Sequence, residues 1–337
     1  MAKNSFNRCF LKVLVVGAGA TGGYFGGRLA QAAQRGHTNI EVTFLVRPKR
    51  AEILKKTGLM IESPQDSFTL PVRTVQHTEL KWEYDLVLLA CKAYDLESAI
   101  LSVYPAIGPD TLILPILNGL AHFDRLDAEF GVHRILGGCC HLNGTLTDAG
   151  VVKLLSDLHG ITFGMRVGNA AHAGVVLDQL QTAFKQTPVR VQYSETVLQA
   201  IWEKYTFLAA FAAMTCLMRA AVGDIMAAAD GETLMLRLLA ECEAAAKHAG
   251  YPLRPSVIDH SKKMLTDKTS VLTASMLRDL ESGGKTESNH IINDMRLRAI
   301  AAGSDATLLS IAWAHFQARE ARLARERKAT ASNQALL

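Results

Sequence analysis

The sequence has few of the features that mark several large classes of protein. Its 337 residues include six cysteines, with no C-x-x-C pair and no Cys/His ligand spacing, which favours a reduced, metal-free, cytoplasmic protein. No window of about 18 or more residues is poor enough in charge to span a bilayer, and the first ten residues lack the apolar stretch of a signal peptide. The net charge of +4 is small and its basic residues are scattered. We therefore expect neither nucleic acid nor membrane as a partner.

Signatures of other enzyme mechanisms are also missing. The sequence contains no H-E-x-x-H, no G-x-S-x-G, no Walker A motif and no carboxylate cluster at metal-ligand spacing. The eleven histidines are isolated, so His141, His260 and His290 are interpreted as ordinary polar residues. This excludes the commonest metal-dependent, serine-dependent and P-loop chemistries.

The length and the hydrophobic pattern predict two domains. Residues 1–193 alternate short β-branched runs with amphipathic stretches, as in a parallel sheet covered by helices, whereas residues 194–325 show long Ala- and Leu-rich segments with helical spacing. Residues 326–337 are expected to be a poorly ordered tail, at the end of a solvated basic helix. The predicted strands are 11–16, 41–46, 85–91, 111–117, 134–140, 150–155, 160–165 and 189–193.

A glycine-rich turn follows the first predicted strand. Gly17, Gly19 and Gly22 have the G-x-G-x-x-G spacing of a Rossmann dinucleotide site, followed by a helical segment and a second strand. The glycines allow a tight turn, close approach of backbone to a pyrophosphate and close helix packing, while the helix N-terminus attracts the anion. The predicted cofactor-binding residues of this turn are Gly17, Ala18, Gly19, Ala20, Thr21 and Gly22.

The end of the second predicted strand indicates which cofactor is bound. An acid there would bind the ribose hydroxyl of NAD, but this chain has Arg47, followed by Lys49 and Arg50. An arginine can bind the 2′-phosphate of NADP with two hydrogen bonds. The sequence therefore favours NADP, with a merely solvated basic loop as the alternative.

Polar residues follow two further strands. Lys92 comes directly after the apolar run 85–91, and Asn118 closes the run 111–117 before Gly119. In an open α/β sheet ligands bind beyond the carboxyl ends of the strands, so both residues are candidates for a site. On local evidence a surface lysine and an Asn-Gly turn are the alternatives.

Taken together and in order, the segments GAGATGG, FLVR, CKAYD, ILNGL, GVVK, WEKY, and SMLRD with TE resemble the ketopantoate reductase family over nearly the whole chain. The resemblance implies a Rossmann-type NADP-binding domain followed by an all-α domain similar to the C-terminal domain of 6-phosphogluconate dehydrogenase. It also implies NADPH-dependent reduction of 2-dehydropantoate to (R)-pantoate, in the biosynthesis of pantothenate and coenzyme A.

The same resemblance implies roles for individual residues. Lys92 would lie near the cofactor, and Asn118 would lie where nicotinamide and substrate meet. Lys204, in WEKY, corresponds to the catalytic lysine of the family. Ser275 would bind the substrate carboxylate, and Glu287 would bind the substrate hydroxyl as the second catalytic residue.

The chain departs from the family pattern on the segment that follows the lysine. Leu208 and Ala212 stand four and eight residues after Lys204, where the family usually presents asparagines to the substrate. The substrate is therefore either 2-dehydropantoate or a different branched or aromatic 2-oxo acid. A non-enzymatic NADP-binding regulator is a further alternative, but it would need none of the predicted catalytic residues. The sequence leaves a homodimer open.

Overall fold

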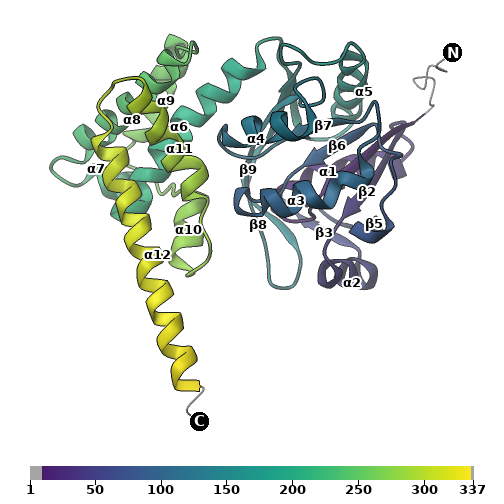
Figure 1. The fold of residues 1–337 in the computed structure, drawn as a ribbon, viewed down its shortest axis with the longest axis horizontal. Coiled ribbons are helices and arrows are strands. Elements are labelled where there is room, and N and C mark those ends of the chain that lie inside the picture. The colour runs from purple at the N-terminus through teal and green to yellow at the C-terminus, as the bar shows by residue number, and fades with distance from the viewer. Residues whose placement is uncertain (1–9, 335–337) are drawn as a thin grey trace. The chain divides into compact units, whose positions relative to one another are not determined.

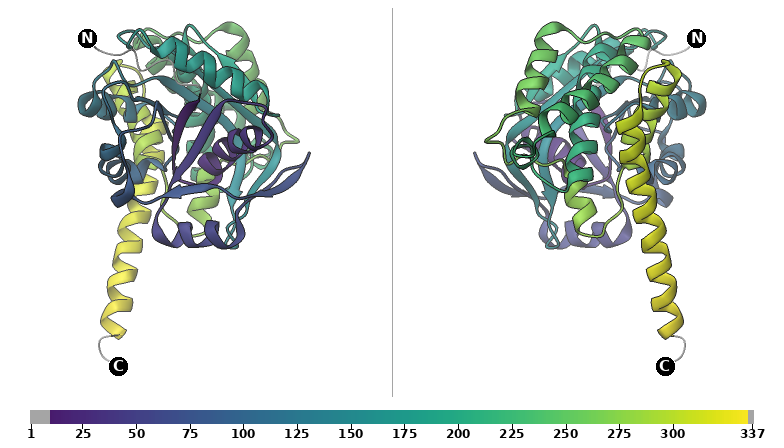
Figure 2. Two further views of the ribbon diagram at one scale, coloured as in Figure 1. Left: turned by 90° about the vertical axis from the view of Figure 1, so that its right-hand side faces the viewer. Right: turned by 90° about the vertical axis from the view of Figure 1, so that its left-hand side faces the viewer.

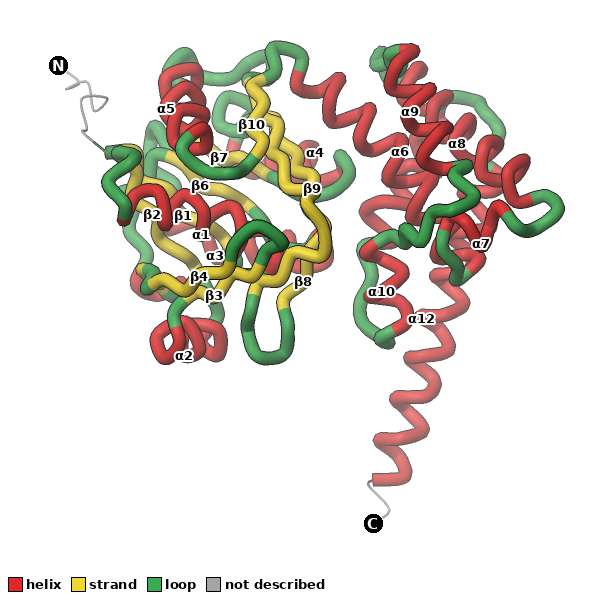
Figure 3. Tube along the Cα trace, turned by 180° about the vertical axis from the view of Figure 1, so that it is seen from behind, coloured by secondary structure: helices red, strands yellow, loops and turns green. Residues whose placement is uncertain are grey.

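The computed structural model describes residues 10–334 and divides them into two compact units (Figure 1). The first unit ends at Ile201 and the second begins at Trp202, except that the loop Gly119–Ala121 belongs with the second. The change of unit thus falls inside one helix, later than the predicted boundary at residue 193. Among the described residues, the first unit combines strands and helices and the second contains helices (Figure 2 and Figure 3). No helix in the described part of the chain combines the length and apolarity that crossing a bilayer requires.

The first unit is built on a five-stranded sheet in the order β5-β2-β1-β6-β7, with every neighbouring pair parallel. Its central strands are apolar on both faces, which is typical of a parallel sheet buried by helices. The strands are β1 (Leu11–Val16), β2 (Ile40–Leu45), β5 (Arg73–Val75), β6 (Leu86–Leu89) and β7 (Leu112–Pro115). The four longer ones match predicted runs within a few residues, whereas β5 was not predicted.

A second, mixed sheet completes the first unit. It has the order β10-β9-β3-β4, and β8 pairs with β9 in addition. Its strands are β3 (Leu59–Glu62), β4 (Ser67–Leu70), β8 (Gly137–Leu146), β9 (Val152–Gly164) and β10 (Arg190–Tyr193). The prediction of separate strands at 150–155 and 160–165 was wrong, because β9 runs unbroken through both along its pairing with β8. The hairpin of β3 and β4 was also missed.

Helix α1 (Ala20–Gln34) contacts strands of both sheets. A Cβ built on Gly26 would lie 2.8 Å from Val15 Cγ2 and from Phe44 Cε1 in the first sheet. A Cβ on Gly27 would lie 2.6 Å from Ile61 Cδ1 in the second. The paired glycines of α1 therefore allow one helix to pack closely against two sheets.

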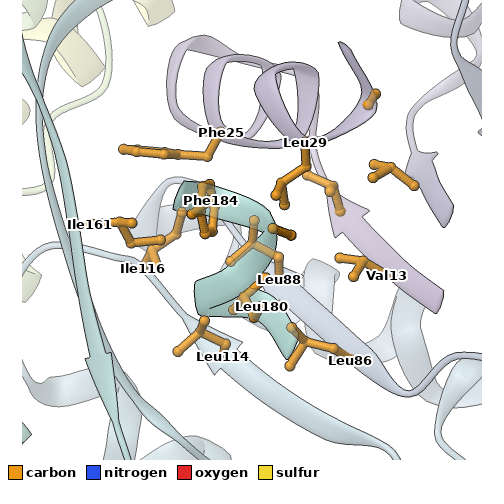
Figure 4. Close-up of a cluster of buried hydrophobic side chains, with 14 of the residues drawn as sticks. Val13, Phe25, Leu29, Leu86, Leu88, Leu114, Ile116, Ile161, Leu180 and Phe184 are labelled. Carbon is orange, nitrogen blue, oxygen red and sulfur yellow. The ribbon is translucent and has the colours of Figure 1, made fainter. Parts of the chain in front are cut away.

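The core of the first unit joins α1, α5 and both sheets. Phe25 and Leu29 of α1 and Phe184 of α5 point toward the central strands and toward Ile161 of β9 (Figure 4). The remaining helices of this unit follow individual strands. They are α2 (Pro48–Thr57), α3 (Leu96–Val103), α4 (Ala121–Phe130) and α5 (Ala173–Lys185), with short 3-10 turns η1 (His77–Glu79), η2 (Ala93–Asp95) and η3 (Tyr104–Ala106).

The described part of the second unit consists of helices (Figure 3). It contains α6 (Val197–Met218) from Trp202 onward, α7 (Val222–Met226), α8 (Gly231–His248), α9 (Pro255–Leu265), α10 (Ser275–Glu281), the π-helix η4 (Asn289–Asn293), α11 (Asp294–Ala301) and α12 (Thr307–Gln334). The helical character predicted for residues after 194 is confirmed by these elements.

The last helix differs from the expectation for the C-terminus. Helix α12 is drawn as one long helix in both views of Figure 2 and continues to Gln334, through most of the tail that was expected to be poorly ordered. Residues 335–337 lie outside the described residues. Arg319 lies in the C-terminal helix that was expected to be solvated, but it is buried, and its guanidinium donates to the carbonyl oxygens of Leu280 and Gly284, each at 3.1 Å. It therefore caps α10 instead of facing solvent.

The packing of α1 predicts opposite effects for two glycine substitutions. Gly26→Ala should lower the free energy of unfolding by about 0.5–2 kcal/mol, because overpacking against two buried side chains exceeds the gain in helix propensity. Gly174→Ala, in α5, should raise it by about 0.4–1 kcal/mol, because the nearest heavy atom to its Cβ is Met165 Sδ at 3.7 Å. Urea unfolding of the two variants measures both changes. A shift in the same direction for both would contradict this packing.

Candidate active site

The carboxyl ends of four parallel strands place the predicted cofactor residues along one edge of the first sheet. Val16 is paired with Leu45 and with Leu89, and Leu89 is paired with Pro115. The segments that follow these paired residues carry Gly17, Arg47, Lys92 and Asn118 in turn. Residues that are distant in sequence thus come to the edge where ligands bind in open α/β sheets.

The three glycines of the turn at this edge differ in whether the fold itself requires a glycine there. Gly17 has φ +92°, a left-handed conformation that favours glycine, and its N–H donates to the carbonyl of Leu45 at 3.0 Å. A Cβ on Gly22 would lie 2.1 Å from the carbonyl oxygen of Gly17, so the third glycine is needed for the fold itself. A Cβ on Gly19, in contrast, would have no heavy atom within 4 Å.

Gly19 is therefore a glycine that internal packing does not require. It is the N-cap of α1, and it has no side chain that could accept a hydrogen bond from the N–H groups of the first turn. Open space beside Gly19 and the positive end of a helix fit a pyrophosphate that approaches the backbone closely. The residues present thus fit the phosphate end of a dinucleotide.

Arg50 supports the glycine turn through hydrogen bonds, a role that was not predicted. Its Nε donates to the carbonyl of Ala18 at 3.1 Å and its Nη1 to the carbonyl of Gly150 at 2.9 Å. Burial lowers the pKa of Arg50, although an arginine remains charged at neutral pH. Arg50 fastens the glycine turn to the loop between β8 and β9, whereas the sequence had suggested only additional charge beside Arg47. The basic run gave no signal that one of its members turns inward.

Arg47 lies at the strand end where the 2′-phosphate of NADP was predicted. It is the N-cap of α2, its side chain is 72% exposed, and its Nη2 lies 3.0 Å from Oδ1 of Asp95. An ion pair this exposed contributes little stability, on the order of 0–1 kcal/mol, so the guanidinium can turn to another anion at low cost. Asp95 follows Lys92 in the turn after β6, and its proximity to Arg47 was not predicted.

In the second unit, the residues next to Lys204 are each held by a different partner. The Trp202 ring stacks on Tyr251, with centroids 6.0 Å apart, and the buried Glu203 accepts a hydrogen bond from Arg254 Nε at 2.8 Å. Lys204 itself is partly exposed. The fixed neighbours on both sides determine which face of α6 presents the lysine.

Tyr205 connects this part of α6 to the segment that follows Glu287. Its buried hydroxyl lies 2.8 Å from the carbonyl oxygen of Ile291 and 2.9 Å from Oδ2 of Asp294, and its one proton serves one of them at a time. Burial, and then the carboxylate of Asp294, raise the pKa of Tyr205 well above its ordinary value, so the phenol stays protonated as a donor. Ile291 belongs to the π-helix η4, and π-helices are frequent at functional sites.

The other two predicted substrate residues of this unit differ in exposure. Glu287 is 7% exposed and lies two residues before the π-helix, and its carbonyl accepts hydrogen bonds from the N–H groups of His290 and Ile291. Ser275 is the first residue of α10 and is exposed. Their roles toward a substrate remain predictions.

The two apolar positions after Lys204 are not equivalent. Leu208 is partly exposed, but Ala212 is only 1% exposed. Between Ile201 and Cys216, α6 buries every residue except Lys204, Phe207, Leu208 and Phe211. These four residues, here called the α6 strip, have the i, i+3, i+4, i+7 spacing of one helical face. The exposed face of α6 therefore includes residue 211, whereas the sequence analysis had placed residue 212 on it.

A parallel Rossmann-type sheet with a glycine turn at its carboxyl edge, followed by a helical unit with a partly exposed lysine, defines a class of oxidoreductases that use a nicotinamide dinucleotide. Residues 13–168 match the family model described as ketopantoate reductase PanE/ApbA, and residues 196–320 match that of its C-terminal domain. The chain belongs to this family and is an NAD(P)H-dependent 2-oxo acid reductase.

Three similar proteins carry different names. The chain is 34% identical over 311 residues to the uncharacterized oxidoreductase YkpB of Bacillus subtilis, covering 92% of this chain and 99% of that protein. The PanE/ApbA family ketopantoate reductase from Ralstonia eutropha JMP134 superposes with a TM-score of 0.80 at 24% identity, covering 93% of this chain and 99% of that one. D-mandelate dehydrogenase with NADH and anilino(oxo)acetate has the same TM-score at 21% identity, with coverage of 93% and 99%. These two likenesses show a shared fold.

The glycine turn predicts that two alanine substitutions will separate folding from cofactor binding. Gly19→Ala should lower the melting temperature only slightly, through the poorer N-cap that alanine makes, but raise the Kd for NADP at least about tenfold, the loss expected from one weakened hydrogen bond to a charged group. Gly22→Ala should lower the melting temperature even without cofactor, because its Cβ meets backbone. Thermal unfolding and a fluorescence titration with NADP measure the two effects. Wild-type affinity in Gly19→Ala would show that the phosphates do not approach this backbone.

Proposed function

We propose that this chain uses NADPH to reduce a 2-oxo acid to the corresponding 2-hydroxy acid, with Lys204 as the proton donor. The main support is the way α6 presents Lys204: the three residues around it in WEKY are buried by defined partners, and the lysine alone is partly exposed. Turnover of a panel of 2-oxo acids, followed by NADPH oxidation, tests the proposal.

The proposed chemistry assigns a task to each polar residue. The nicotinamide, when bound, supplies the hydride that the carbonyl carbon receives. Negative charge then develops on the carbonyl oxygen, and the Lys204 ammonium stabilises it and gives it a proton, which the lysine regains from solvent. Glu287 forms a hydrogen bond with the hydroxyl of the substrate, and Ser275 binds the substrate carboxylate. Asn118 can donate or accept a hydrogen bond without changing its own protonation state.

Two substrates are candidates. The family resemblance puts 2-dehydropantoate first, with (R)-pantoate as product and a role in the route to pantothenate. A 2-oxo acid with an apolar side chain is second, and it is favoured by the α6 strip, where Leu208 stands in place of an amide. A hydroxyl buried there without a partner would lose about 1–3 kcal/mol, which is roughly ten- to a hundredfold in kcat/KM.

A preference for NADPH over NADH is the expected consequence of Arg47. Arg47→Ala should weaken NADPH binding by about 1.5–3 kcal/mol, the scale of hydrogen bonds to a charged group, and leave NADH binding nearly unchanged. Arg190→Ala is a suitable control, because Arg190 is another exposed arginine of the same unit and pairs with Asp157. Calorimetric titration with both cofactors measures the difference. Equal losses for NADPH and NADH would refute the role of Arg47.

The proton-donor role predicts that Lys204→Ala lowers kcat by at least about a hundredfold while the Kd for NADPH changes little. Lys204→Arg should be similarly slow, because a guanidinium keeps the charge but does not release a proton. Lys247→Ala, at an exposed position near the end of α8, is the control. Steady-state kinetics and cofactor titration measure these effects. If only the affinity for the cofactor fell, Lys204 would act on the cofactor and not on the substrate, and the proton-donor role would be refuted.

A further inference from the structure

The α6 strip has a composition that its neighbours on the helix do not share. Beyond the lysine, it consists of Phe207, Leu208 and Phe211, so it presents two aromatic rings and one branched aliphatic side chain. Each ring is partly exposed, although apolar side chains along the rest of this segment are buried. Large aromatic side chains contribute most when they are covered, so their partial exposure beside the lysine proposed as proton donor fits a surface that a ligand covers.

The two rings are arranged as one surface. Phe207 and Phe211 stack, with centroids 5.6 Å apart and planes inclined by 24°. They are one helical turn apart, and Phe207 and Leu208 are themselves one turn from Lys204. The apolar surface therefore begins one helical turn from Lys204, the residue whose ammonium group would hold the carbonyl oxygen of the substrate.

The chemistry of the strip limits what the substrate side chain can be. Apart from Lys204, its side chains neither donate nor accept a hydrogen bond, so a hydroxyl on the substrate side chain would gain nothing from them. An aromatic ring gains from a second ring beyond the area that it buries, by about 0.5–1.5 kcal/mol, whereas an aliphatic chain gains only from the area. The strip thus discriminates against hydroxylated side chains strongly and against aliphatic ones moderately.

We propose that Phe207, Leu208 and Phe211 form the specificity surface for the side chain of an aromatic 2-oxo acid, such as phenylpyruvate. This inference rests on the proposed function, because it takes Lys204 as the residue at the carbonyl oxygen. The same three residues place 2-dehydropantoate, whose side chain carries a hydroxyl, among the poorer substrates.

The first test compares substrates on the unmodified enzyme. With NADPH as reductant, kcat/KM for phenylpyruvate should exceed that for 2-dehydropantoate at least about tenfold, the lower bound for burying an unpaired hydroxyl. It should exceed that for 4-methyl-2-oxopentanoate, an aliphatic acid, by about two- to tenfold, the equivalent of one aromatic pair. A preference for 2-dehydropantoate would overturn the inference and leave the proposed function standing.

The second test removes the rings while keeping apolar volume. Phe207→Leu and Phe211→Leu should each lower the ratio of kcat/KM for phenylpyruvate to that for 4-methyl-2-oxopentanoate, and the double variant should lower it further. Leu208→Asn should raise kcat/KM for 2-dehydropantoate relative to that for phenylpyruvate. Phe316→Leu is the matched control, because Phe316 is a buried ring of the same unit, 1% exposed, and its loss should affect stability but not the ratio.

The outcomes of the two tests separate the inference from the function beneath it. Ratios that stay constant across the ring variants, while all acids are still reduced, would show that the rings are structural and would refute the inference alone. Failure to reduce any of these acids with NADPH or NADH would refute the proposed function, and the inference would fall with it. A ratio that changes in Phe316→Leu as much as in the strip variants would also count against a specific surface.

Discussion

Close packing of helix α1 against two sheets is the constraint on which the first unit depends. Val15 and Phe44 approach the helix at Gly26, and Ile61 approaches it at Gly27, so close that a methyl group would not fit without movement. Glycine inside a helix costs about 1 kcal/mol relative to alanine, and burial of most of α1 between the sheets offsets that cost. Because α1 is fixed on both sides, its N-terminus has one position at the sheet edge. The position of the predicted phosphate site is a consequence of that packing.

The second unit positions its lysine in a comparable way, through side chains that surround it. Glu203 is paired with Arg254, and Tyr205 bonds to the π-helix that follows Glu287. Helix α6 cannot rotate about its axis without breaking both contacts. The exposed face is therefore determined by buried polar partners as well as by apolar burial, and this makes the α6 strip a defined surface.

Some of these features follow from local patterns and some do not. The strands β1, β2, β6 and β7 are continuous apolar runs between turn residues, which is why the pattern located them within a few residues. Strands β3, β4 and β5 are short and partly exposed, so no continuous apolar run marks them in the sequence, and they form by pairing with partner strands. The unbroken course of β9 is likewise imposed by its pairing with β8.

Individual side chains show the same division. The spacing of Gly17, Gly19 and Gly22 after a strand was sufficient to locate a dinucleotide turn, because that chemistry needs small residues at fixed intervals. The family motifs predict Lys204 as the catalytic residue, and that role stays a prediction. The inward turn of Arg50, the capping of α10 by Arg319 and the exposure of Phe211 in place of Ala212 could not be read from spacing. Each depends on which distant backbone or side chain lies opposite, and only packing of the whole chain supplies that neighbour.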